Sequence, residues 1–174
     1  MEFKKKKYLE IIFVAIFSLM LFVIAALYNH IFTKIMSIAT YLTWHNLFEF
    51  VSIIASFSIF IVTYYIYEES GSLRMIILAC SFFVMGSIDT FHTLSYKGMA
   101  DFFITNESAN RATTFWILSR LIGSIGLLSA AIIPAHKTIN LNKWNFIAPT
   151  FILVISLLII VTFKQEFFPA MYIE

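Results

Sequence analysis

The sequence has 174 residues, of which 60% are hydrophobic, 18% aromatic and only 13% charged, with a formal net charge of +2. This composition excludes an ordinary soluble domain, and we expect no nucleic acid among its partners. The single cysteine, Cys80, excludes an intrachain disulfide and a cysteine-based metal motif. The chain is therefore expected to be an integral membrane protein whose first partner is the lipid bilayer.

Five continuously apolar segments, each long enough to cross a bilayer, follow one another along the chain. They predict helices at about 8–28, 41–67, 74–95, 112–134 and 145–163. Strands of a membrane barrel would instead alternate polar and apolar residues over about ten positions. We therefore predict an all-α fold, a polytopic membrane bundle of about five transmembrane helices that forms one domain over residues 1–174. The first segment lacks a small-x-small cleavage site and is longer than a signal-peptide core, so it is interpreted as a retained helix.

The placement of Lys and Arg predicts the orientation. If the amino terminus is cytoplasmic, that side carries seven basic residues and the other side four. The seven are Lys4, Lys5, Lys6, Lys7, Arg74, Lys137 and Lys143, and the four are Lys34, Lys97, Arg111 and Lys164. The excess of positive charge inside indicates a multi-pass protein of the cell membrane with its amino terminus in the cytoplasm. Five spans then place the carboxyl terminus outside.

Paired polar residues occur inside three of the apolar segments. Each pair is three or four residues apart and so shares one helix face. The pairs are His45 with Glu49, Asp89 with His92, and Trp116 with Arg120. Counting residues from each helix end predicts two layers, an outer one of His45, His92 and Trp116 and an inner one of Glu49, Asp89 and Arg120. Ionisable groups at this depth indicate a functional site, although a mutually satisfied network that fixes helix register is the alternative.

The residue types in these layers favour a ligand pocket open to the outside. Two imidazoles and two carboxylates on helices are a credible set for zinc or iron, which makes His45, Glu49, Asp89 and His92 the candidate metal ligands. A haem between the two histidines is a second possibility.

Further residues complete the candidate ligand-binding set. Trp116 and Arg120 are expected to shape the pocket, and Tyr96 and Lys97 to lie at its mouth. A tight turn at Gly98 would place Lys97 where it attracts an anionic ligand.

Three ordered motifs carry a resemblance to a known family. They are Thr43-Trp44-His45-Asn46-Leu47-Phe48-Glu49-Phe50, the Asp89-x-x-His92 pair running on to Met99, and Ala112-Thr113-Thr114-Phe115-Trp116-Ile117-Leu118-Ser119-Arg120. The chain from its second helix to Tyr172 resembles the membrane-associated sensor domain of the third class.

The resemblance implies an input domain for an environmental signal in a bacterial or archaeal receptor. Proteins of that family feed cytoplasmic output modules such as histidine kinases of two-component systems, PAS domains or diguanylate cyclases. The family has further helices beyond the segment from Phe168 to Tyr172. We therefore expect a carboxy-terminally truncated or orphan sensor, or one that works with a partner subunit, with a homodimer left open.

The preferred function is thus a sensory input bundle without enzymatic activity of its own. The alternative is a transporter or proton-relay subunit that uses the same buried His and acid cluster. A membrane metal hydrolase with Glu49 as general base is a third reading, but the segment lacks the second histidine of the usual helix motif.

Overall fold

The computed structural model describes residues 2–28 and 37–171, with side chains described for residues 12–28, 37 and 40–171. Five helices and one 3-10 turn follow in order: α1 (Glu2–Leu27), α3 (Ile38–Ser70), α4 (Leu73–Leu94), α5 (Ala109–Ile132), α6 (Trp144–Phe163) and η1 (Gln165–Phe167). The described ranges contain no named β-strand. The all-α prediction is confirmed.

Four of these helices are long and apolar enough to cross a membrane, namely α3, α4, α5 and α6. In the part of α1 whose side chains are described, Ile12–Leu27 forms a shorter apolar helix. The predicted multi-pass membrane protein is therefore confirmed at the level of helix length and composition. Lys34, Tyr172 and the side chains of Lys4–Lys7, which entered the predictions above, lie outside the described residues.

The start of α5 differs from the predicted start at residue 112. The helix begins at Ala109 because Ser108 caps it, its side chain accepting a hydrogen bond from the Asn110 amide at 3.1 Å. This shift places Arg111 in the first turn of the helix, where it is buried. Arg111 was expected in the preceding polar loop, so the earlier helix start changes its surroundings.

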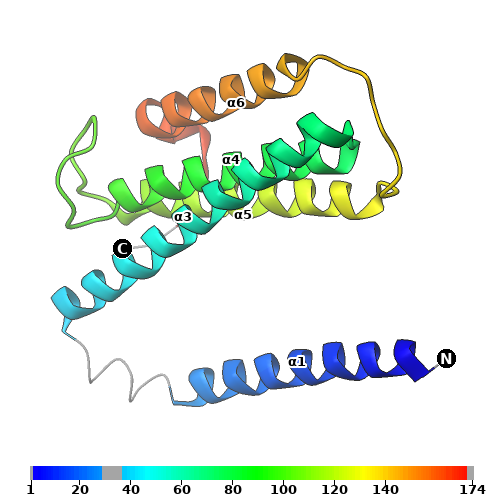
Figure 1. The fold of residues 1–174 in the computed structure, drawn as a ribbon. Helices are drawn as coiled ribbons and strands as arrows, with labels where there is room; N and C mark the ends of the chain where they lie inside the picture. The colour runs from blue at the N-terminus through cyan, green and yellow to red at the C-terminus, as the bar shows by residue number, and fades with distance from the viewer. Residues whose placement is uncertain (1, 29–36, 172–174) are drawn as a thin grey trace. The chain divides into compact units, whose positions relative to one another are not determined.

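Contacts divide the chain into two compact units, residues 1–44 and residues 45–174. The first unit holds α1 and the beginning of α3. In the second, α4, α5 and α6 pack side by side (Figure 1). Their shared core consists of Val84 and Ile88 of α4, Phe115 of α5, and Val154 and Val161 of α6.

Helix α3 packs onto α4 in the second unit through aromatic side chains. The Phe83 ring of α4 lies 6.1 Å from the Phe57 ring and 5.1 Å from the Phe60 ring, measured between centroids. Close approach is possible because Gly86 of α4 faces this contact, where a Cβ would lie 3.2 Å from the Ser56 Cβ. The two helices that carry His45 and His92 are thus held against each other.

Two glycines of α5 allow it to lie close against α4. A Cβ on Gly126 would come 2.0 Å from the Ser81 Oγ and 2.7 Å from its Cβ. A Cβ on Gly123 would come 2.5 Å from the Sδ of Met85. Small residues at such interfaces let membrane helices approach each other, which favours van der Waals packing.

We expect Gly126→Ala to destabilise the bundle and Gly123→Ala to have little effect. The Ser81 Cβ is fixed to its backbone, so the helices must separate, at a cost of about 1–3 kcal/mol. The Met85 side chain can instead rotate away, and both variants gain about 1 kcal/mol of helix propensity. Thermal unfolding of the detergent-solubilised variants tests this difference, and equal midpoints would contradict it.

Candidate metal centre

His92 lies in the last turn of α4 and is oriented by the backbone of α5. Its Nδ1 lies 2.8 Å from the carbonyl oxygen of Ala112. Since a carbonyl only accepts hydrogen bonds, Nδ1 carries the proton, and in the neutral imidazole Nε2 then carries the lone pair. The Nε2 atom is buried and has no hydrogen-bond partner among the described residues. The neutral form of His92 therefore presents the Nε2 lone pair in a fixed direction.

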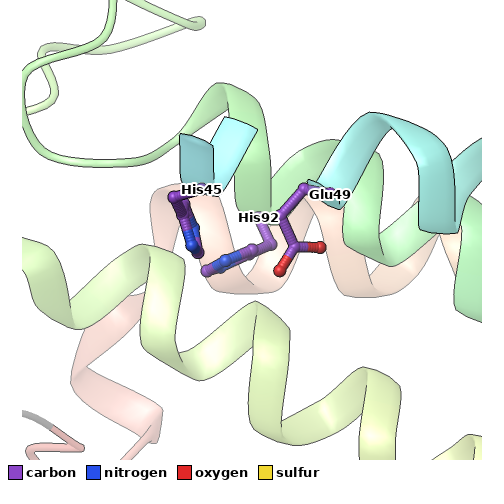
Figure 2. Close-up of side chains that lie close together, drawn as sticks. All are labelled: His45, Glu49 and His92. Atoms are coloured by element: carbon purple, nitrogen blue, oxygen red, sulfur yellow. The ribbon is translucent and has the colours of Figure 1, made fainter. Parts of the chain in front are cut away.

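His45 and Glu49 of α3 lie beside this nitrogen. One ligand atom from each of His45, Glu49 and His92 lies within 4.8 Å of the others. Figure 2 shows the three side chains turned toward one another, two from α3 and one from α4. The Glu49 Oε2 is also buried and, in the described part of the chain, accepts no hydrogen bond. The result is a cluster of two nitrogens and one carboxylate, which we call the His45–Glu49–His92 cluster.

Aromatic packing surrounds the two imidazoles. The His45 and His92 rings meet edge to face at 5.7 Å between centroids. The Tyr96 ring lies 4.8 Å from that of His45 and 6.0 Å from that of His92. Tyr96 therefore lies against the cluster, as expected for a residue at its mouth.

The turn after α4 is held near the cluster. Gly98 has a φ of 95°, and the Met99 amide donates to the Tyr96 carbonyl at 3.0 Å. The Asn46 side chain of α3 donates to the Met99 Sδ at 3.1 Å. The turn expected at Gly98 is present, and Lys97 within it is exposed.

Asp89 and Arg120 form a separate ion pair. The Asp89 Oδ2 accepts a hydrogen bond from the Arg120 Nη2 at 3.0 Å, and the Asp89 side chain is completely buried. The Arg120 guanidinium also lies 5.8 Å from the centre of the Trp116 ring. Asp89 is outside the group of three potential ligands that the described residues form.

The two predicted layers are thus regrouped. Helix depth places His45 beside His92 as expected, but the longer Glu49 side chain reaches back one turn to join them. Trp116 lies beside Arg120, because both residues are on one face of α5. Asp89 is neutralised by Arg120 and leaves Glu49 as the carboxylate of the cluster.

Three groups that form hydrogen bonds around the end of α4 and the start of α5 were not identified from the sequence. The Ala112 carbonyl has no side-chain signal, because it acts through the backbone. Asn106 is buried and donates to the Leu94 carbonyl at 3.0 Å and the Ala100 carbonyl at 2.6 Å. Arg111 donates to the Asn106 Oδ1. The Ser108 cap was the available signal for placing Arg111 on a helix.

A family model described as a membrane-associated sensor domain matches residues 36–174. No curated protein matches the chain significantly, and no solved structure does. The matched residues include the whole His45–Glu49–His92 cluster.

Proposed function

Because the chain belongs to the MASE3 family of membrane-associated sensor domains, we propose that it is a sensory input domain whose ligand is one divalent metal ion. The ion is held by His45, Glu49 and His92. Family membership supports the sensory role, and the cluster geometry supports the metal. The domain itself is not catalytic.

The observation that carries the proposal is the hydrogen bond from His92 Nδ1 to the Ala112 carbonyl. Histidines that bind metals commonly donate their second ring N–H to a carbonyl or carboxylate, which fixes the tautomer and the ring direction. Here that bond leaves Nε2 directed into a cluster that also contains a carboxylate. The arrangement supports a metal ligand more than a histidine that only packs.

The donor set suits zinc or iron. Nitrogen and oxygen ligands bind zinc at about 2.0–2.2 Å, so two ligands of one ion lie at most about 4.4 Å apart. The cluster atoms lie within 4.8 Å of each other, so small side-chain rotations bring them to a common ion. Three protein ligands leave a fourth position for water or for a signal molecule.

A single ion fits this cluster better than a haem. The His45 and His92 rings contact each other edge to face at 5.7 Å, and the Tyr96 ring covers His45 at 4.8 Å. A planar macrocycle between the two histidines would require both contacts to open. An ion requires neither contact to open.

Metal binding in this cluster would join three helices. His45 and Glu49 belong to α3 and His92 to α4, and the Ala112 carbonyl connects His92 to α5. Signalling requires that two states of the bundle bind the ion with different affinity. A state with α3 displaced from α4 would separate the ligands and bind the ion weakly. The output is a histidine kinase or cyclic di-GMP module, in a partner or in the same protein.

The distribution of basic residues supports a cytoplasmic amino terminus. In that orientation the cluster lies toward the outside, because His45 is near the start of α3 and His92 near the end of α4. The sensor would then respond to metal outside the cytoplasm.

A proton-relay or transporter subunit has less support. A relay requires polar side chains that bond to one another across the membrane. The hydroxyls of Ser58, Thr63 and Ser81 instead donate to carbonyls of their own helices. These hydroxyls therefore do not extend a path from the cluster.

Elemental analysis and an absorption spectrum of the purified, detergent-solubilised protein test the proposal. We expect about one zinc or iron per chain and no haem band. The His45→Ala, His92→Ala double variant should lose the metal, while His136→Ala, which changes an exposed histidine, should keep it. Metal that persists in the double variant, or its absence from the parent protein after incubation with zinc and with iron, would overturn the metal assignment.

A further inference from the structure

A cavity lies between the segment before α5 and the end of α6. Its volume is about 240 Å³, and its walls include Glu107, Arg111, Thr162 and Gln165. None of the residues of the His45–Glu49–His92 cluster lines it. The cavity is too small for a large cofactor but holds a small solute or a single headgroup.

Arg111 is a buried cation with unused hydrogen-bond donors. Only 6% of the residue is exposed, and its Nη2 donates to Asn106. Its Nε and Nη1 atoms are buried and, in the described part of the chain, have no hydrogen-bond partner. No carboxylate of a described residue lies within 4.0 Å of the guanidinium. Asp101 acts on the guanidinium electrostatically from a greater distance, but the two buried N–H groups still lack acceptors, so the site favours an anion.

Two more polar groups of the cavity wall are unused. Thr162 is 4% exposed, and its hydroxyl has no partner among the described residues. The Gln165 Nε2 donates to the Thr114 hydroxyl at 3.0 Å, whereas its Oε1 atom is buried and, over the same residues, accepts no hydrogen bond. The wall thus offers donors from Arg111, a hydroxyl from Thr162 and one acceptor from Gln165.

We propose that this cavity binds the carboxylate or phosphate oxyanion of a small ligand that also carries an O–H or N–H group. The oxyanion accepts from Arg111 and Thr162, and the ligand donor reaches the Gln165 Oε1. The first turn of α5 adds the partial positive charge of a helix amino terminus. Glu107 also lines the cavity, but its side chain is exposed and its carboxylate stays hydrated. The anion source is either a free solute or a lipid headgroup.

Calorimetric titration of the protein in a maltoside detergent tests the proposal. The probes are lactate, inorganic phosphate and acetate, and phosphatidic acid in mixed micelles. We expect saturable binding of lactate, phosphate or phosphatidic acid, and at least several-fold weaker binding of acetate, which has no donor for Gln165. Binding of free ions identifies a solute site, and binding of phosphatidic acid alone identifies a headgroup site.

Three variants separate a specific site from general attraction. Arg111→Gln should weaken binding at least tenfold and Thr162→Val several-fold. Lys164→Gln removes a nearby exposed charge that pairs with Glu166 at 3.7 Å, and it should leave binding unchanged. Thr162→Val removes only an unpartnered hydroxyl, so it should fold even if Arg111→Gln does not. An equal loss in Lys164→Gln, or no binding that depends on Arg111 or Thr162, would overturn the proposal.

Discussion

The substitution Arg120→Met should lower the free energy of unfolding by about 3–5 kcal/mol, because it leaves a buried charge without its partner. The Asp89 side chain is completely buried and receives its hydrogen bond from Arg120 at 3.0 Å. The opposite change, Asp89→Leu, should also destabilise the bundle. Arg120 lies near the middle of the membrane-spanning helix α5, where its charge would keep only the Trp116 ring at 5.8 Å.

The double variant Asp89→Leu, Arg120→Met tests whether the two charges depend on each other. With both charges removed, no unpaired group stays buried, and stability should recover to within about 1–2 kcal/mol of the parent protein. Unfolding by a denaturing detergent in mixed micelles gives the four free energies of the cycle. Asp101→Asn, at an exposed acid, is the control. Additive losses in the double variant would show that the pair contributes little coupling.

Helix positions and the main polar pairs follow from the sequence, because hydropathy and spacing depend on local order. The predicted span at 41–67 lies within α3 (Ile38–Ser70), and the one at 74–95 nearly coincides with α4 (Leu73–Leu94). Depth counting also brings His45 beside His92. These inferences need only the rise per residue and the helix ends.

The partners of the two carboxylates do not follow from the sequence. Depth along a helix does not give the helix's rotation or crossing, which decide that Arg120 reaches Asp89 while Glu49 lies near His92. The role of the Ala112 carbonyl also cannot be predicted from the sequence. Every residue has a backbone carbonyl, and only packing decides which one pairs with the His92 ring. Arg111 was placed in a loop because its burial depends on an α5 start set by the Ser108 cap.

Because Glu49 and Asp89 have different partners, we expect their substitutions to affect metal binding to different extents. His92→Ala should weaken zinc binding at least 100-fold, about 2.7 kcal/mol, because it removes the best-oriented nitrogen of the cluster. Glu49→Gln should weaken it at least tenfold by removing the charged oxygen ligand. Asp89→Asn should change the affinity by less than about threefold, because its carboxylate is engaged by Arg120.

Competition titration of zinc against a chromophoric chelator measures all three affinities on the same solubilised protein. Asp89→Asn keeps an oxygen that accepts from Arg120, so the variant should fold, and its thermal midpoint checks this. A loss of affinity in Asp89→Asn as large as that in His92→Ala would mean that Asp89 leaves Arg120 to join the ion. The four-ligand site predicted from the sequence would then hold in the metal-bound state, and binding would have to break the ion pair. That cost would make the Asp89–Arg120 pair the element through which metal changes the bundle.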